Sequence, residues 1–222
     1  MAKSSKSAKS APSSKPTKPI PSAKPARPPK PAGAPKPAKP SSYCEAVSTM
    51  EKDNVHVHYH DNEYGFPIDD DNLLFARLIL EINQAGLSWT TILNKKDNFF
   101  MAFDNFDIAT VAAYKQKQID RLLADAGIIR NRLKVEAAIE NARRIHAIQK
   151  EYGSFKAWLD HHHPLTKPEW VKLFKTTFRF TGGEIVGEFL MSCGYLPGAH
   201  VESCNVYKRV VKLKPSWLTN KK

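Results

Sequence analysis

The sequence predicts an all-α fold behind a disordered tail, and three observations lead to this prediction. From Tyr43 onward, apolar residues recur at intervals of three and four, which is the period of amphipathic helices. No segment shows the alternation of apolar and polar residues that is typical of a strand. Residues 1–42 hold 11 of the 16 prolines and only one large apolar side chain after Met1, so they cannot bury enough surface to fold.

The tail also accounts for most of the charge. The formal net charge is +12, but residues 1–42 hold ten Lys or Arg and no acidic residue, while the other 180 residues carry 24 basic against 22 acidic side chains. The charge of the folded part therefore does not by itself indicate DNA binding. The tail is expected to be an extended arm that touches phosphates without reading sequence, or else a solubility or targeting segment.

Composition predicts one globular domain over residues 43–210 and a basic C-terminal extension over 211–222. No apolar run suits a secretory peptide or a membrane span, so we expect a cytoplasmic protein without membrane contact, in the bacterial cytosol or nucleoid. Three cysteines are too few for a disulfide framework and direct attention to metal binding or simple burial. Cys193 lies on an apolar helix face and is expected to be packed.

The predicted helices begin with the strongest one, over residues 72–85. Asp69 to Asp71 supply capping carboxylates at its start, Leu74 and Leu78 belong to its apolar stripe, and Gly86 ends it. Further helices are expected over residues 107–114, 118–127, 130–152, 155–159, 167–177 and 184–193.

Between the last two predicted helices, residues 178–183 form a short apolar turn with two adjacent glycines. This is the outline of a helix-hairpin-helix, in which the backbone approaches a phosphate and free amides of the next helix hold its charge. An ordinary helix connection can contain the same glycines, so both interpretations stay open. The DNA contacts expected from this turn are Arg179, Thr181 and Gly182.

A metal site is suggested by His200 and Cys204, whose spacing of four residues lets both side chains face one ion. Cys44 and His60 are the best candidates for two further ligands, and they would tie the start of the domain to its end. Four protein ligands leave no position for water, so the metal would be structural and not catalytic. A buried thiol and a core histidine without a metal remain the alternative.

Glu81 falls on the same inward stripe as Leu74 and Leu78. A buried carboxylate is costly unless it is paired with an Arg or a backbone amide, or has a functional use, and both possibilities are open. Trp89 follows after an exposed turn. Together with Tyr59, these side chains would form a pocket for a flat, positively charged base, because the rings stack on it and the carboxylate complements its charge.

Five separated motifs follow one another in the chain: residues 59–65, 80–89, 126–132, 178–182 and the pair His200 and Cys204. In this order they resemble the 3-methyladenine DNA glycosylase I family, and the match covers about residues 43–207. The resemblance implies a helix-hairpin-helix DNA glycosylase fold with one structural zinc ion per chain. The implied zinc ligands are Cys44, His60, His200 and Cys204.

The resemblance also implies roles for the pocket residues. Tyr59, Glu81 and Trp89 would hold the extruded base, with Glu81 as the catalytic residue. Gly86 and Leu87 would lie at the turn that fills the gap left in the duplex.

Two positions depart from the family pattern. Tyr64 stands where the family usually has a tryptophan, and this change should preserve an aromatic contact. His56 stands where some members have another pocket tyrosine, which leaves that wall of the pocket undefined.

The implied activity is hydrolysis of the N-glycosidic bond of 3-methyladenine in alkylated double-stranded DNA, by a monomeric enzyme of base-excision repair that does not cut the strand. Residues 195–200 lack the Asp that related glycosylases carry after the hairpin. A cationic base leaves readily, so little acid catalysis is needed. A protein that binds damage without excising it and a glycosylase for other lesions are the alternatives.

Overall fold

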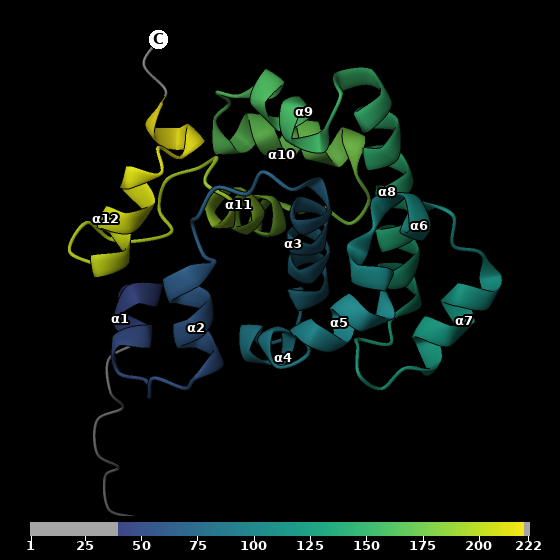
Figure 1. Ribbon diagram of the computed structural model, residues 1–222, viewed down its shortest axis with the longest axis horizontal. Coiled ribbons are helices and arrows are strands. Elements are labelled where there is room, and N and C mark those ends of the chain that lie inside the picture. The colour runs from purple at the N-terminus through teal and green to yellow at the C-terminus, as the bar shows by residue number, and fades with distance from the viewer. Residues whose placement is uncertain (1–39, 220–222) are drawn as a thin grey trace, which may run out of the picture. The chain divides into compact units, whose positions relative to one another are not determined.

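The computed structural model describes residues 40–219, and no strand occurs in this range, so the predicted all-α fold is confirmed (Figure 1). Two 3-10 helices lie at Asp104–Phe106 (η1) and Ser216–Leu218 (η2). The α-helices in chain order are α1 (Tyr43–Ser48), α2 (Val55–Asn62), α3 (Asp71–Gln84), α4 (Trp89–Leu93), α5 (Lys96–Ala102), α6 (Ile108–Ala112), α7 (Gln116–Ala124), α8 (Arg132–Tyr152), α9 (Phe155–His162), α10 (Lys167–Thr177), α11 (Gly183–Ser192) and α12 (Asn205–Lys212).

Every helix expected from the apolar spacing is present, with its ends moved by a few residues. The helix predicted over 72–85 is α3, and the carboxylate of Asp70 caps it. The helix predicted from residue 130 is α8, which begins at Arg132 because the side chain of Asn131 caps its first turn. Sequence analysis missed α1, α2, α4, α5 and α12. None of these is longer than eight residues, so their helical periodicity is weak, although α6 and α9 are as short and were predicted.

The central helix of the core is α3, against which α8 and α11 pack (Figure 1). Its residues 74–83 are all buried, including the polar side chains of Arg77, Glu81 and Asn83. A helix enclosed on all sides must pair its polar groups internally or point them into a cavity. The amide of Asn83 takes the first course and donates to the carbonyl of Ile79 at 2.8 Å.

The turn between α10 and α11 is fixed by the fully buried Asn141 of α8. The amide of Asn141 donates to the carbonyl of Arg179 at 3.0 Å, and its oxygen accepts from the amide of Arg179 at 2.8 Å. The hydroxyl of Thr181 donates to the carbonyl of Phe174 at 3.0 Å. Phe180, at the tip, has a φ of 64° and is 43% exposed. The backbone of the predicted hairpin is therefore held rigidly.

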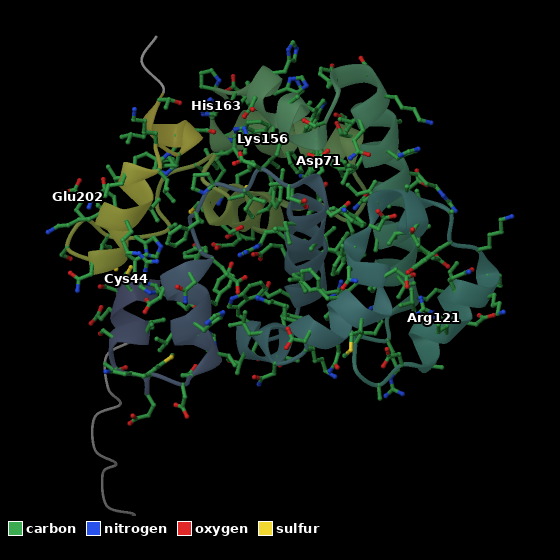
Figure 2. The ribbon with its side chains drawn as sticks, viewed as in Figure 1. Cys44, Asp71, Arg121, Lys156, His163 and Glu202 are labelled. Atoms are coloured by element: carbon green, nitrogen blue, oxygen red, sulfur yellow. The ribbon has the colours of Figure 1, made fainter. Side chains whose placement is uncertain are left out.

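The first two helices, α1 and α2, lie beside the last one, α12 (Figures 1 and 2), and the sulfur of Cys204, just before α12, lies 3.7 Å from Nε2 of His60. The amide of Trp217 donates to the carbonyl of Gly194 at 3.1 Å, so the described part of the predicted C-terminal extension folds back onto the domain. The predicted tail falls almost wholly on residues 1–39, outside the described residues. Within residues 40–219, no helix combines the length and apolar character needed to cross a membrane.

Asp71 joins the first turn of α3 to the first turn of α9 (Figure 2). Its carboxylate accepts from the backbone amides of Phe155 at 2.7 Å and Lys156 at 2.9 Å, and from the side-chain amide of Gln149 at 2.8 Å. An ionised acceptor at the start of a helix is favourable because the first amides of a helix have no partner within it.

We expect Asp71→Ala to lower the free energy of unfolding by about 2 kcal/mol, because charge-assisted bonds to partly buried amides are lost. Asp69→Ala is the matched control. Its side chain is 87% exposed and lies 3.8 Å from the ammonium of Lys156, so the expected loss is below about 0.5 kcal/mol. Urea denaturation measures both variants, and equal losses would contradict this account.

Candidate base-binding pocket and metal centre

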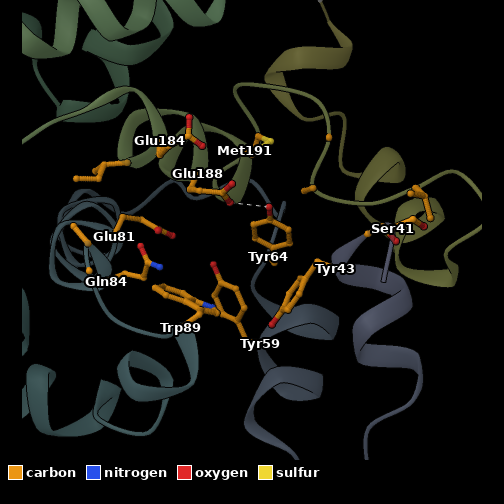
Figure 3. Close-up of a pocket in the computed structure, with 17 residues that line it drawn as sticks. Ser41, Tyr43, Tyr59, Tyr64, Glu81, Gln84, Trp89, Glu184, Glu188 and Met191 are labelled. Atoms are coloured by element: carbon orange, nitrogen blue, oxygen red, sulfur yellow. Dashed lines mark hydrogen bonds between the residues drawn. The ribbon is translucent and has the colours of Figure 1, made fainter. Parts of the chain in front are cut away.

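A pocket of about 900 Å³ lies between α2, α3, α4 and α11, and the segment around Tyr43 closes one side of it (Figure 3). The structure brings the three predicted pocket residues, Tyr59, Glu81 and Trp89, to this one cavity. Tyr43, Glu184, Glu188 and Met191 also line it, and the sequence did not indicate them.

Aromatic rings form one wall of the pocket. The ring of Tyr59 lies 5.2 Å from that of Trp89 and 5.6 Å from that of Tyr64, and the ring of Tyr43 lies 5.5 Å from that of Tyr64 (centroid distances). Tyr64 thus keeps an aromatic side chain in the wall, as its sequence position suggested. These rings offer flat apolar faces to a ligand and can attract a cation.

His56 does not line the pocket but supports it from behind. Its Nδ1 lies 2.9 Å from the hydroxyl of Tyr43, and its Nε2 lies 2.8 Å from the hydroxyl of Thr90. The wall that the sequence left undefined at position 56 is therefore supplied by Tyr43. Nothing in the sequence signalled this, because Tyr43 reaches the pocket only through the packing of α1 on α2.

Arg77 is buried beside Glu81 on α3 but is directed to other partners. Its guanidinium donates to the hydroxyl of Tyr59 at 2.6 Å and to the carboxylate of Glu63 at 3.2 Å. Glu63 also pairs with Lys96. The ion pair of Arg77 is thus with Glu63, which does not line the cavity, and the hydroxyl of Tyr59 is fixed in place.

Within residues 40–219, the carboxylate of Glu81 has no hydrogen bond and no ion pair, although the residue is only 5% exposed. It points into the pocket (Figure 3). The possibility that Glu81 is an ordinary buried pair with an Arg or a backbone amide therefore does not hold. A buried carboxylate that faces a cavity without a partner is suited to receive one from a ligand.

Burial raises the pKa of Glu81 to about 8. The charge of Arg77 lowers the pKa and that of Glu188 raises it, but both effects are smaller than that of burial. The carboxyl group is then largely neutral in the empty pocket at neutral pH. A cation beside it would favour the ionised form and bring the pKa down.

The turn after α3 is held in a defined shape next to the pocket. The ammonium of the buried Lys134 donates to the carbonyls of Asn83 at 2.9 Å and Ala85 at 2.7 Å. Gly86 has a φ of +82°, which other residues rarely adopt. Leu87 is 40% exposed at the tip of the turn, an unusual place for a large apolar side chain.

The three hairpin residues predicted to contact DNA differ in whether they can reach it. The side chain of Arg179 is exposed, whereas Thr181 is buried and its hydroxyl is turned inward. The Thr181 side chain therefore cannot reach a phosphate, because its hydroxyl is already used within the turn. Gly182 is the N-cap of α11, so the first amides of that helix are free of helical partners.

The four predicted metal ligands come together outside the residues that line the pocket. The ligand atoms of Cys44, His60, His200 and Cys204 all lie within 4.8 Å of one another. Nδ1 of His200 lies 3.5 Å from the sulfur of Cys44 and 3.2 Å from Nε2 of His60. Ligands bound at about 2.0–2.3 Å to one tetrahedral ion stand roughly 3.3–3.8 Å apart, so this cluster could hold a metal ion.

In each histidine, the ring nitrogen that does not face the cluster lies next to an oxygen atom. Nδ1 of His60 lies 2.7 Å from a carboxylate oxygen of Asp61, and Nε2 of His200 lies 2.7 Å from the carbonyl of Tyr64. Such partners commonly orient the histidines of metal sites. Cys193, by contrast, is 2% exposed and packed in the core, as predicted.

Comparison with known proteins gives consistent matches. A family model described as methyladenine glycosylase matches residues 49–171. DNA-3-methyladenine glycosylase 1 of Escherichia coli (strain K12) is 34% identical over 182 residues, which cover 73% of this chain and 97% of the relative. DNA-3-methyladenine glycosylase of Haemophilus influenzae is 32% identical over 170 residues, which cover 68% of this chain and 91% of the relative.

A solved structure of 3-methyladenine DNA glycosylase I from Staphylococcus aureus, described as the structural basis of 3-methyladenine recognition, matches with a TM-score of 0.64. The two sequences are 33% identical, and the match covers 70% of this chain and 93% of the solved chain. The family model spans more than half of the chain, and the relatives are matched over nearly their whole length. This chain belongs to the methyladenine glycosylase family.

Proposed function

We propose that this protein is a monofunctional DNA glycosylase that excises 3-methyladenine from alkylated double-stranded DNA in base-excision repair. The observation that carries the proposal is the unpaired, buried carboxylate of Glu81 in a pocket with an aromatic wall. The named activities of the relatives support the same substrate.

The pocket selects a cation over a neutral base. In DNA, methylation of N3 gives adenine a positive charge. Tyr59 and Trp89 present ring faces to that charge, and Glu81 ionises beside it and accepts a hydrogen bond from the exocyclic amine. Unmodified adenine is neutral and leaves Glu81 protonated, so it gains less from both interactions.

Excision needs orientation more than acid catalysis. The bond between C1′ and N9 breaks with its electron pair going to the purine, which leaves as neutral 3-methyladenine. Water adds its oxygen to C1′ and releases a proton, and an abasic site remains. Tyr59, Trp89 and Glu81 hold the base in line for this step in a site from which most water is excluded.

The residues around the pocket favour simple hydrolysis. None of the residues in the range 40–219 that line the pocket is a lysine, so none of these residues offers an amine to attack C1′ and form a Schiff base. Without that intermediate, the DNA strand is not cleaved.

Two surfaces would dock the DNA. The free amides at the start of α11, with Gly182 and the side chain of Arg179, would hold a backbone phosphate as a helix-hairpin-helix does. Gly86 and Leu87 would enter the duplex and fill the space of the extruded nucleotide, because Leu87 stands exposed on a fixed turn.

We further propose that the cluster of two cysteines and two histidines holds one structural zinc ion. Thiolate and imidazole ligands in a closed set of four suit zinc and leave no position for a reactive water. The ion would link the start of the domain, residues 43–210, to its end and so support the α2 segment that carries Tyr59.

A monomer in the cytoplasm is the expected working form, since one chain supplies the whole pocket.

The activity is tested by release of free 3-methyladenine from methylated duplex DNA under single-turnover conditions. Glu81→Gln should slow release at least about 100-fold, because the amide cannot balance the charge of the base. Glu151→Gln, an exposed change on α8, is the charge-matched control and should leave the rate unchanged. If Glu81→Gln releases the base at the wild-type rate, Glu81 has no role in the site. If the wild-type protein releases no base, the protein binds damaged DNA without excising the base.

The raised pKa of Glu81 has a consequence for stability. The folded-state pKa of about 8 exceeds the ordinary value of 4.5, so the folded state keeps a proton that the unfolded state loses. Between these pH values the stability contribution of Glu81 falls as pH rises. Relative to the wild type, Glu81→Gln should therefore stabilise the empty protein by roughly 2–4 kcal/mol more at pH 8 than at pH 5. Urea denaturation at both pH values measures this, and an equal effect would contradict it.

For the metal, elemental analysis should find about one zinc per chain, as one tetrahedral site requires. His200→Ala should lower both the zinc content and the thermal midpoint. Cys193→Ala provides the comparison, since it removes a buried thiol outside the cluster and should leave zinc content unchanged. Full zinc content in His200→Ala would disprove the assignment.

A further inference from the structure

The pocket contains a second carboxylate, that of Glu188, to which the proposed function gives no role. Glu188 lies on α11, so it reaches the cavity from a different helix than Glu81 does (Figure 3). Its Oε2 accepts from the hydroxyl of Tyr64 at 3.1 Å. Across residues 40–219 it forms no ion pair, whereas Glu184, one turn earlier, lies 3.6 Å from the ammonium of Lys167.

The acidic side chains of the pocket differ in depth. The side chain of Glu184 is 90% exposed, Glu188 is half-buried, and Glu81 is almost fully buried. A nucleotide that enters the pocket base first places the purine against Glu81. Its sugar is then left on the side nearer to solvent, and Glu188 is the more exposed of these two carboxylates.

A ligand at this position is indicated independently by Glu81. Its buried carboxylate is unpartnered and directed into the same cavity, so a positively charged group is the expected occupant. During excision that charge does not stay on the purine. As the bond to the base breaks, positive charge develops at C1′ and the ring oxygen of the sugar.

We propose that Glu188 is a catalytic residue that acts on the sugar while Glu81 acts on the base; this assignment rests on the proposed function. The carboxylate of Glu188 stabilises the positive charge that develops at C1′. When the C1′–N9 bond breaks, its electron pair goes to the purine. The oxygen of water bonds to C1′, and the water proton passes to the carboxylate of Glu188 and then to solvent.

The surroundings of Glu188 suit this work. Burial raises its pKa above the ordinary range, the charge of Glu184 adds to this, and the Tyr64 hydroxyl and the charge of Lys167 act in the opposite direction. A carboxylate with a raised pKa is a better proton acceptor near neutral pH than an exposed one. The hydrogen bond from Tyr64 fixes one oxygen and leaves the other for water or sugar.

The test compares two duplexes, one with a positively charged pyrrolidine in place of the damaged nucleoside and one with a neutral tetrahydrofuran abasic analogue. The pyrrolidine resembles the charge of the sugar in the transition state, and neither analogue contains a base. Wild-type protein should bind the charged analogue at least about tenfold more tightly. In Glu188→Gln the two affinities should lie within about twofold, and in Glu151→Gln the wild-type preference should persist.

An unchanged preference in Glu188→Gln, or no preference in the wild type, would overturn the role of Glu188. A purely structural role would weaken binding of both analogues alike and leave their ratio unchanged. If Glu188→Gln binds neither duplex, Glu188→Asp replaces it. Glu188→Asp keeps the negative charge but places it farther from the sugar. A smaller ratio of the affinity for the charged analogue to that for the neutral analogue supports the proposal, and the wild-type ratio overturns it.

The same variants separate this inference from the function on which it rests. If wild-type protein releases no 3-methyladenine, the proposed function itself fails. If the wild type releases it and Glu188→Gln does so at the same rate, only the role of Glu188 is rejected.

Discussion

The structure depends on one electrostatic constraint, which is a carboxylate buried without a partner beside an aromatic wall. Ionising Glu81 in the empty pocket is costly because the carboxyl group is almost fully buried and has no hydrogen-bond or ion-pair partner among residues 40–219. Arg77 could have met this need, but Tyr59 and Glu63 take its hydrogen bonds. Under the proposed function, this missing partner is what suits the cavity to a positively charged base. Were Arg77 paired with Glu81, the pocket would hold a neutral ion pair with little reason to prefer a methylated purine.

The fold serves this constraint from several directions. The packing of α3 in the core buries most of the Glu81 side chain, while α2 and α4 bring Tyr59 and Trp89 to the cavity. The cysteine and histidine cluster contacts the same segment, because His200 bonds to the carbonyl of Tyr64 in the pocket wall. The proposed metal site and the proposed base pocket therefore share the segment that runs from α2 to Tyr64.

Sequence alone predicted much of this architecture, because long helices and short motifs leave clear patterns. The helical class, the inward direction of Glu81 and the four clustered ligands were all accessible from spacing or family resemblance. The pairing of Arg77 with Glu63 could not be predicted in this way. Arg77 and Glu81 stand four residues apart on one helix, and this spacing favours a pair between them that the structure does not form. Tyr43 and Glu188 were missed for a different reason. Their positions follow from the packing of α1 and α11, and no local pattern encodes it.

The most direct measurement of the central claim is the pKa of Glu81, followed by carbon-13 NMR of its carboxyl group in the empty protein and with 3,9-dimethyladeninium bound. This ligand keeps the charge of the damaged base and lacks a sugar, so it reports on Glu81 alone. The account predicts a pKa near 8 in the empty pocket and one well below neutrality in the complex. An ordinary carboxylate pKa in the empty protein, unchanged by the ligand, would contradict it.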